Sequence, residues 1–164
     1  MLGKALLWLR SLLWTLLLPG VVAGFVPWRY FGLNAVRFNA TNATHWAGLA
    51  GIALGLGLLV ACIVEFAQSG KGTLAPPDAP RSLVVQGLYR YVRNPMYLSV
   101  TLILLGEALL AWSAPLLVYW ALWFVGVNVF VLVYEEPTLS RRFGEEYRRY
   151  CARVHRWLPR PPRN

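Results

Sequence analysis

Charged residues are scarce in this chain. They make up 14% of its 164 residues, whereas an ordinary soluble domain has about 25%. Hydrophobic residues account for 57%, a composition that excludes an ordinary soluble protein and predicts a membrane protein. The two longest segments that are not apolar, 67–96 and 135–164, are too short for a soluble catalytic domain. Any chemistry therefore has to take place at the membrane.

Cysteine and histidine are also rare. The chain has two of each, Cys62, Cys151, His45 and His155, and they are far apart in the sequence. Neither type shows the spacing of a zinc or haem site. We therefore expect no metal and two free thiols.

Four apolar stretches mark candidate membrane spans, at about residues 6–26, 44–66, 97–112 and 116–134. The third stretch is short for a full span, so we expect its polar head to lie in the membrane interface. After the fourth, apolar side chains recur at helical spacing over 137–154, opposite a charged face. The predicted fold is an all-α membrane protein, a single domain over 1–164, with about four transmembrane helices and a C-terminal amphipathic interfacial helix.

The first apolar stretch has two interpretations. Lys4 and Arg10 precede a short apolar region, as they do in a cleavable signal peptide. We favour a retained helix, because the apolar run continues to Val26 and its removal would leave a poorer bundle. Pro19 and Gly20 predict a kink within this helix.

The net charge of +9 is distributed unevenly. The N-terminus, the 67–96 loop and the C-terminal segment carry 2, 4 and 8 Lys/Arg, whereas the loop after the first span carries only Arg29 and Arg37. The positive-inside rule then places both termini in the cytoplasm, with a bacterial inner membrane as the expected location. We expect these charges to bind anionic membrane lipids rather than nucleic acid.

Two ionisable clusters lie at equal distances from a predicted turn. Arg93 precedes Ala114 by 21 residues, and Glu135 follows Ala114 by the same interval. Turn-forming residues Ser113 and Pro115 flank Ala114, so an antiparallel helical hairpin is expected here. Each arm would be about 31 Å long, close to the thickness of the hydrocarbon core. The sequence therefore predicts that Arg93 meets the pair Glu135 and Glu136 at one membrane face.

Small residues recur in the second span at four-residue spacing, at Ala47, Gly51 and Gly55. Such a stripe lets another helix approach closely. It favours packing within the chain, with homodimerisation or a groove for a lipid tail as alternatives. We expect Thr44 to cap this helix.

Two motifs flank the hairpin: QGLYRYVRNPMY at 86–97 and EEPTLSRRFGEEYRRYCARVHRWLP at 135–159. Together they resemble the integral-membrane methyltransferases, such as isoprenylcysteine carboxyl methyltransferase and, more distantly, phospholipid N-methyltransferase. The resemblance covers roughly 83–159. It implies S-adenosylmethionine as a small-molecule methyl donor in a helical site, and a lipophilic (lipid or prenyl-like) acceptor that arrives from the bilayer.

The resemblance, together with the donor's chemistry, assigns to the donor site Gly87, Tyr89, Arg93, Asn94, Pro95, Tyr97, Glu135, Glu136 and Tyr147. Arg93 and Glu136 are the predicted catalytic residues. A guanidinium suits the donor's carboxylate, and carboxylates suit its ammonium group or ribose hydroxyls. The tyrosines suit its adenine or its sulfonium. Asn128 and Glu65 are expected to border the pocket. The alternative is ordinary interfacial residues, with the two glutamates paired to an arginine of the following helix.

Glu107 supports a competing hypothesis, because a carboxylate within a span is costly unless it is paired, protonated or hydrated. In that hypothesis the chain is a small transporter or a membrane interaction subunit, without enzymatic activity. A third hypothesis keeps the fold and replaces the donor by another nucleotide or a lipid. We favour a structural carboxyl that is hydrogen-bonded to Tyr119, Trp120 or Trp123.

Overall fold

The computed structural model describes residues 17–69 and 83–161, except the side chains of 66–69. The first part of the first predicted span and the predicted loop over 70–82 lie outside the described residues.

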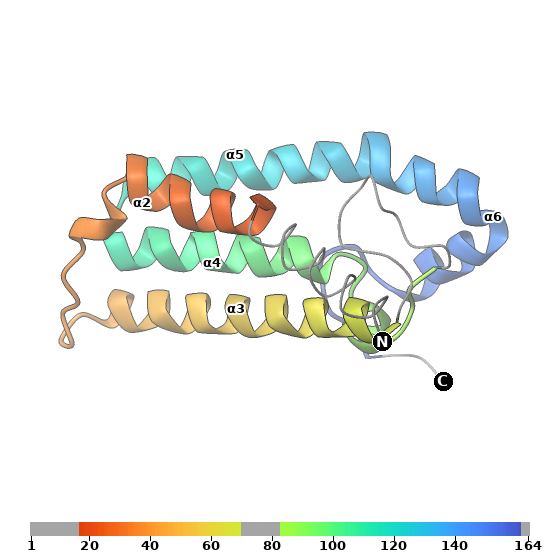
Figure 1. Cartoon of the computed structure of the whole chain (residues 1–164), viewed down its shortest axis with the longest axis horizontal. Coiled ribbons are helices and arrows are strands. Elements are labelled where there is room, and N and C mark those ends of the chain that lie inside the picture. Colours follow the sequence, from red (N-terminus) through yellow and green to blue (C-terminus); the bar gives the residue numbers. More distant parts are fainter. Residues whose placement is uncertain (1–16, 70–82, 162–164) are drawn as a thin grey trace, which may run out of the picture.

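The described elements, in chain order, are η1 (Val21–Phe25), α2 (Val26–Tyr30), η2 (Leu33–Ala35), α3 (Ala43–Ser69), η4 (Gly87–Arg90), α4 (Pro95–Ala111), α5 (Ala114–Phe130), η5 (Val131–Glu135) and α6 (Glu136–Arg153). Helices α3, α4 and α5 run side by side, and α2 lies between α4 and α5 (Figure 1). We call the end with the α4–α5 turn the turn end. The opposite end, where α4 begins and α6 folds back, is the polar end.

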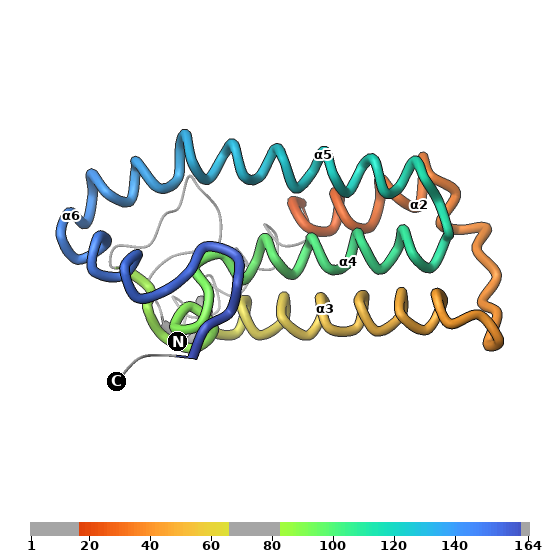
Figure 2. Tube along the Cα trace, turned by 180° about the vertical axis from the view of Figure 1, so that it is seen from behind, coloured from red at the N-terminus to blue at the C-terminus, as the bar shows by residue number. Residues whose placement is uncertain are grey.

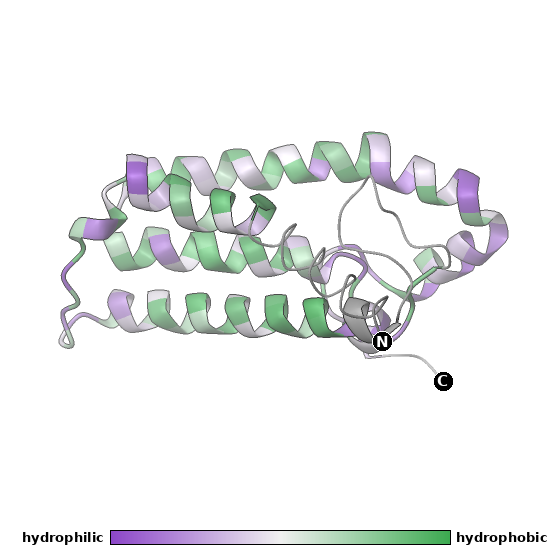
Figure 3. Cartoon of the chain, in the orientation of Figure 1, coloured by the Kyte–Doolittle hydropathy of each residue, from purple (hydrophilic) through white to green (hydrophobic). Residues whose placement is uncertain are grey.

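Helix α4 forms the centre of the bundle. Its residues Val100, Leu104 and Ala108 are at most 1% exposed. The outer face of α5 is apolar and exposed instead, as at Leu122 (66%) and Val125 (59%). Figure 3 shows this apolar character along α3, α4 and α5, and the hydrophilic character of α6. An apolar exterior of this kind is typical of a protein surrounded by lipid.

Two described helices are long and apolar enough to cross a membrane. One is α3, over Ala43–Glu65, and the other is the continuous helix that starts with α5 at Ala114. Helix α4 has 17 residues and is the shorter apolar helix between them. The structure therefore confirms the all-helical class and supports two membrane-spanning helices.

Glycines bring α3 and α4 into close contact. A Cβ atom on Gly48 would lie 2.7 Å from the carbonyl oxygen of Gly106, and one on Gly55 would lie 2.7 Å from that of Ser99. The predicted small-residue stripe therefore packs inside the chain. One residue of the predicted stripe was wrong. Ala47 is exposed, and Gly48 takes its place between α3 and α4. The helical register, at 100° per residue, puts Gly48 with Gly55 on one face.

The α4–α5 turn lies where the turn-forming residues predicted it. Helix α4 starts at Pro95, as expected for proline in a first turn. It ends at Ala111, and the C-cap residue Trp112 adopts the left-handed conformation with φ of 46°. Ser113 then caps α5, since its side chain accepts a hydrogen bond from the amide of Leu116.

The predicted last helix, 137–154, corresponds to α6 (Glu136–Arg153), and the π-helical turn η5 joins it directly to α5. It is interrupted at Gly144, whose φ of 54° and ψ of −122° lie outside the helical region. A residue without Cβ adopts such angles readily. The predicted cap of α3 was wrong. Thr44 is not the cap, because the side chain of Asn42 accepts a hydrogen bond from the amide of Thr44 at 2.9 Å.

The predicted first span ends later than expected. The helix that includes residues 17–20 continues through η1 and α2 to Tyr30. The irregularity expected at Pro19 and Gly20 takes the form of the π-helical turn η1, directly after them. Proline and single π-helical turns are both recognised causes of irregularity in a helix.

Candidate active site

The two motif segments meet at the polar end. Nη1 of Arg93 lies 3.1 Å from Oε1 of Glu136, and the hydroxyl of Tyr97 donates a hydrogen bond of 2.9 Å to Oε2 of Glu135. Arg93 lies just before α4, and the two glutamates lie where η5 joins α6. The antiparallel arms are therefore equal in length, and the predicted meeting of the arginine with the acidic pair is confirmed.

A second arginine holds Glu136 more closely than Arg93 does. The guanidinium of Arg156 donates from Nε to Oε1 at 2.7 Å and from Nη2 to Oε2 at 2.8 Å. This parallel geometry is the strong, bidentate form of an arginine–carboxylate pair. The Glu136 carboxylate accordingly raises the pKa of Arg156. The expected alternative, a pair with an arginine early in α6, is not what the structure contains.

The chain after α6 runs back along the first motif. Val92 and His155 form an isolated parallel bridge, and the amide of Arg93 donates to the carbonyl of His155 at 2.9 Å. Further on, the amide of Arg160 donates to the carbonyl of Tyr91 at 2.9 Å. Figure 2 shows this final segment beside the one that leads into α4. These backbone bonds place Arg156 against Glu136.

The same segment reaches α5. Nε1 of Trp157 donates to Oδ1 of Asn128 at 2.9 Å, and its ring centroid lies 5.5 Å from that of Phe124. Asn94, at the N-cap of α4, donates to the carbonyl of Arg156 at 3.3 Å. Asn128 was predicted to line the pocket, and its carbonyl oxygen is instead bonded to Trp157.

Gly87 lies against the carboxyl group of Glu65, a residue of α3. Its φ is 55°, and a Cβ atom built on it would collide with the carboxyl group of Glu65. Oε1 of Glu65 accepts a hydrogen bond of 2.7 Å from the amide of Leu88. Glycine is therefore required here by both backbone conformation and space. Glu65 borders this region, as expected.

Tyrosines join the first motif to α6. The hydroxyl of Tyr150 donates to the carbonyl of Tyr89 at 2.8 Å, and Tyr147 is buried, with 5% of its surface exposed. Desolvation raises the pKa of Tyr89 well above its usual range. Its phenol therefore stays protonated at neutral pH and remains a hydrogen-bond donor.

Arg93 retains unused donor capacity in a buried position. Its Nη1 also contacts Sγ of Cys151 at 2.8 Å, while its Nε is buried and has no partner among the described residues. Only 14% of its side chain is exposed. Arg93 and Arg156 together carry two positive charges against the single negative charge of Glu136. This group therefore suits an additional anionic group.

Glu107 does not form the predicted hydrogen bonds. It is 5% exposed, and its Oε2 has no partner among the described residues. The indole nitrogens of Trp120 and Trp123 are also unpartnered there, and the hydroxyl of Tyr119 donates to the carbonyl of Val22. Each tryptophan packs against the apolar core cluster instead.

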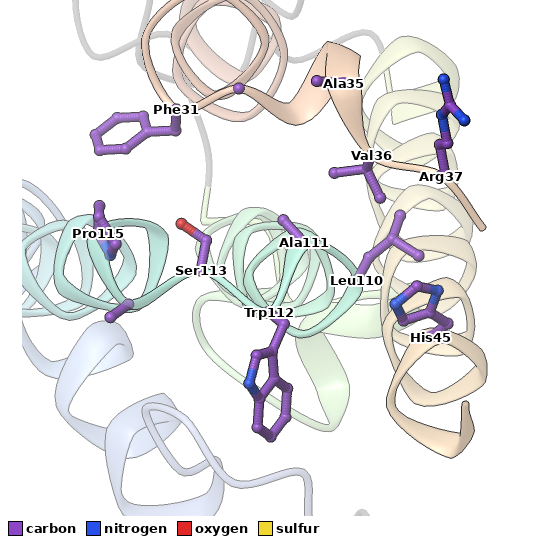
Figure 4. Close-up of a pocket in the computed structure, with 12 residues that line it drawn as sticks. Phe31, Ala35, Val36, Arg37, His45, Leu110, Ala111, Trp112, Ser113 and Pro115 are labelled. Carbon is purple, nitrogen blue, oxygen red and sulfur yellow. The ribbon is translucent and has the colours of Figure 1, made fainter. Parts of the chain in front are cut away.

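A cavity of about 520 Å³ opens at the turn end, far from the two motifs. Phe31 and Ser113 lie on one side of it, and Arg37 and His45 lie on the other (Figure 4). None of the predicted donor residues lines it, and no carboxylate does. We therefore do not assign the donor to this cavity. Within the described ranges, no group of three or more His, Cys, Asp or Glu is placed to hold a metal ion.

Sequence reasoning missed Arg156, Trp157 and Cys151. It predicted one uninterrupted helix over 137–154 and no contact from the residues after it. The reversal at Gly144 brings them back (Figure 1). A glycine inside an otherwise helical pattern is the signal that pointed to such a break.

Comparison with known proteins gives the site its context. The phospholipid methyltransferase family model matches residues 43–146. An uncharacterized protein of Haemophilus influenzae is 41% identical over 68 residues, which is 38% of this chain and the whole of that protein. Methanethiol S-methyltransferase 1 of Bradyrhizobium diazoefficiens is 37% identical over 76 residues, 44% of this chain and 24% of that enzyme. The chain thus matches about a quarter of the second relative, and it belongs to the phospholipid methyltransferase family of integral-membrane methyltransferases.

Proposed function

We propose that this protein transfers a methyl group from S-adenosylmethionine to a lipophilic acceptor, at the polar end of the bundle. The donor supplies a methyl group on a cationic sulfonium. The observation that carries the proposal is the 3.1 Å pair between Arg93 and Glu136, which joins the two family motifs. Beside it lie a second carboxylate, that of Glu135, and several tyrosines. Together with Arg93 they give the site both charge signs and aromatic surface.

Arg93 is the residue we assign to the donor's carboxylate. Its buried Nε has no partner among the described residues, and a buried unpaired donor is costly unless a ligand satisfies it. The start of α4 lies next to it, where Asn94 gives no side-chain cap to the backbone amides after Pro95. Those amides provide further donors for an anion.

The two glutamates have different roles in this proposal. Both oxygens of Glu136 are held by guanidiniums, so we assign it to ordering Arg93 and Arg156 around the donor. Glu135 accepts one hydrogen bond, from Tyr97, and is the better partner for the donor's ammonium group or ribose hydroxyls. Gly87 lets the first motif pass close to Glu65.

The tyrosines of the site suit the remaining parts of the donor. Tyr89 and Tyr147 lie on the two segments that meet here, and Tyr97 is bonded to Glu135. Aromatic faces attract a sulfonium by cation–π interaction and stack on adenine. Methyl transfer by direct displacement needs the two reactants held in line, and water excluded, more than it needs acid–base groups.

The acceptor is proposed to arrive through the bilayer. The apolar exposed side chains of α5 continue into η5 as far as Val133, which is 72% exposed and precedes Glu135 by two residues. An amphipathic molecule in the membrane would therefore meet the site laterally. Oxygen, nitrogen and sulfur acceptors all remain candidates, and the methanethiol enzyme among the relatives favours testing a lipophilic thiol first.

The orientation is part of the same proposal. We place the polar end at the cytosolic face of a bacterial inner membrane, because most Lys and Arg residues lie in the segments that gather there. Four spans, with α6 on the membrane surface, complete this topology. The exposed arginines of α6 support it, since they suit anionic headgroups.

Two measurements test the function. The full chain in detergent is expected to bind S-adenosylhomocysteine in a calorimeter and to transfer a labelled methyl group to a lipophilic acceptor. Glu136→Ala is expected to reduce transfer to background. Glu145→Ala is the matched control, because that glutamate is exposed on the same helix. Transfer that survives the first change, or is lost equally in both, would remove Glu136 from the site.

A further inference from the structure

A second cavity lies at the polar end, between the first motif and α6. Its volume is about 560 Å³. Arg90 from η4 lines it together with Arg149 and Arg153 from α6. Leu83 adds an apolar wall. None of the residues that we assign to the donor lines this cavity, so it is a separate feature of the molecule.

The charge of this cavity is not balanced. Arg90, Arg149 and Arg153 form no ion pair and no side-chain hydrogen bond within the residues that the structure describes. The lining includes one carboxylate, that of Glu146, and it lies beyond ion-pair distance of all three. The two arginines of α6 are four residues apart, a spacing at which like charges destabilise a helix. A bound anion would relieve that repulsion.

The lining also indicates what kind of anion fits. Guanidinium groups from two segments can surround a phosphate and donate to several of its oxygens. Leu83 and Val85 provide apolar surface beside them, which a small free anion does not need. Helix α6, which provides part of the lining, lies at the end of the apolar bundle (Figure 3), where a lipid headgroup would be.

We propose that this cavity binds the phosphate headgroup of an anionic phospholipid. The bound headgroup would bridge η4 and α6. These two segments already touch through the bond from Tyr150 to the carbonyl of Tyr89, and Tyr150 also lines the cavity. Binding should therefore stabilise the polar end. The proposal does not depend on the identity of the methyl donor.

The test compares two triple variants of the full chain in a non-ionic detergent. Arg90→Gln/Arg149→Gln/Arg153→Gln removes the cavity arginines. Arg141→Gln/Arg142→Gln/Arg148→Gln removes three exposed arginines of α6 that do not line it. Both lower the net charge of +9 by three, so bulk electrostatics are matched.

Binding is measured by native mass spectrometry and by thermal unfolding with phosphatidylglycerol, phosphatidylcholine or inorganic phosphate. We expect phosphatidylglycerol alone to raise the melting temperature of the wild-type protein. Its dissociation constant should weaken at least about tenfold in the cavity variant and less than about twofold in the control. Equal weakening in both variants, or no preference for the anionic lipid, would overturn the proposal. An equal rise in melting temperature with inorganic phosphate would show that the cavity binds a free anion, and would overturn the proposal that it binds a lipid headgroup.

Discussion

The bidentate pair between Arg156 and Glu136 allows the sharpest prediction. Its two bonds measure 2.7 and 2.8 Å, and the side chains are 29% and 20% exposed. Exposed pairs contribute about 0–1 kcal/mol, whereas hydrogen bonds to buried charges contribute about 1.5–3 kcal/mol each. Partial exposure puts this pair between the two limits, so we expect a coupling energy of about 1–2 kcal/mol.

The coupling energy is measured with a double-mutant cycle of Arg156→Gln and Glu136→Gln. Unfolding in mixed micelles can be followed by the fluorescence of the eight tryptophans. Glu136→Gln should be the more damaging single change. We expect it to lower the free energy of unfolding by about 2–4 kcal/mol, because it leaves Arg93 and Arg156 without a counter-charge. Arg156→Lys should not restore the wild-type stability, since an ammonium group cannot donate two parallel hydrogen bonds to a carboxylate as a planar guanidinium does.

The surface pair between Arg148 and Glu145 is the matched control. It has the same 2.8 Å distance, and its side chains are 68% and 59% exposed. Its coupling energy should stay below about 0.5 kcal/mol. If the Arg156–Glu136 cycle gave a value no larger than this control, Glu136 would not hold Arg156 in place, and its proposed role in ordering that arginine would be refuted.

Three further predictions concern other parts of the bundle. Gly48→Ala should destabilise the protein by about 1–3 kcal/mol, because its methyl group would meet the α4 backbone at 2.7 Å. Gly57→Ala, on the open side of α3, should stabilise it by about 0.5–1 kcal/mol, and unfolding in micelles compares the two. Gly87→Ala should weaken S-adenosylhomocysteine binding in calorimetry. A positive φ costs about 1–2 kcal/mol in residues other than glycine, and the added methyl group would displace Glu65. An affinity equal to that of the wild-type protein would contradict this. Glu107→Gln should keep methyl transfer within about twofold of wild type, whereas a complete loss would contradict a purely structural role for this carboxyl group.

The sequence was sufficient to predict the hairpin and the meeting of its ends. Arg93 and Glu135, the first residue of the acidic pair, lie 21 residues either side of Ala114, and a helix of fixed rise makes equal intervals equal in length. The start of α4 at Pro95 was also predictable, because proline fits a first helical turn and disfavours helix before it. These features depend on local geometry, which a single sequence contains.

The contacts made by the end of the chain were not predictable in the same way. They depend on the angles at one residue, Gly144, which turn α6 back toward the first motif. Pro137 lies in the first turn of α6, and the π-helical turn η5 before it keeps α6 continuous with α5. The pairing of Arg156 with Glu136 follows from that reversal, so it is a tertiary consequence without a local pattern.

Photo-crosslinking tests the central claim most directly. Ultraviolet light is used to attach labelled S-adenosylmethionine to the full chain in detergent, and the labelled peptides are then identified by mass spectrometry. The account predicts label between Gly87 and Tyr97 or between Glu135 and Cys151, and competition by S-adenosylhomocysteine. Label at the turn-end cavity, in residues 31–45 or 110–115, would contradict a donor site at the polar end.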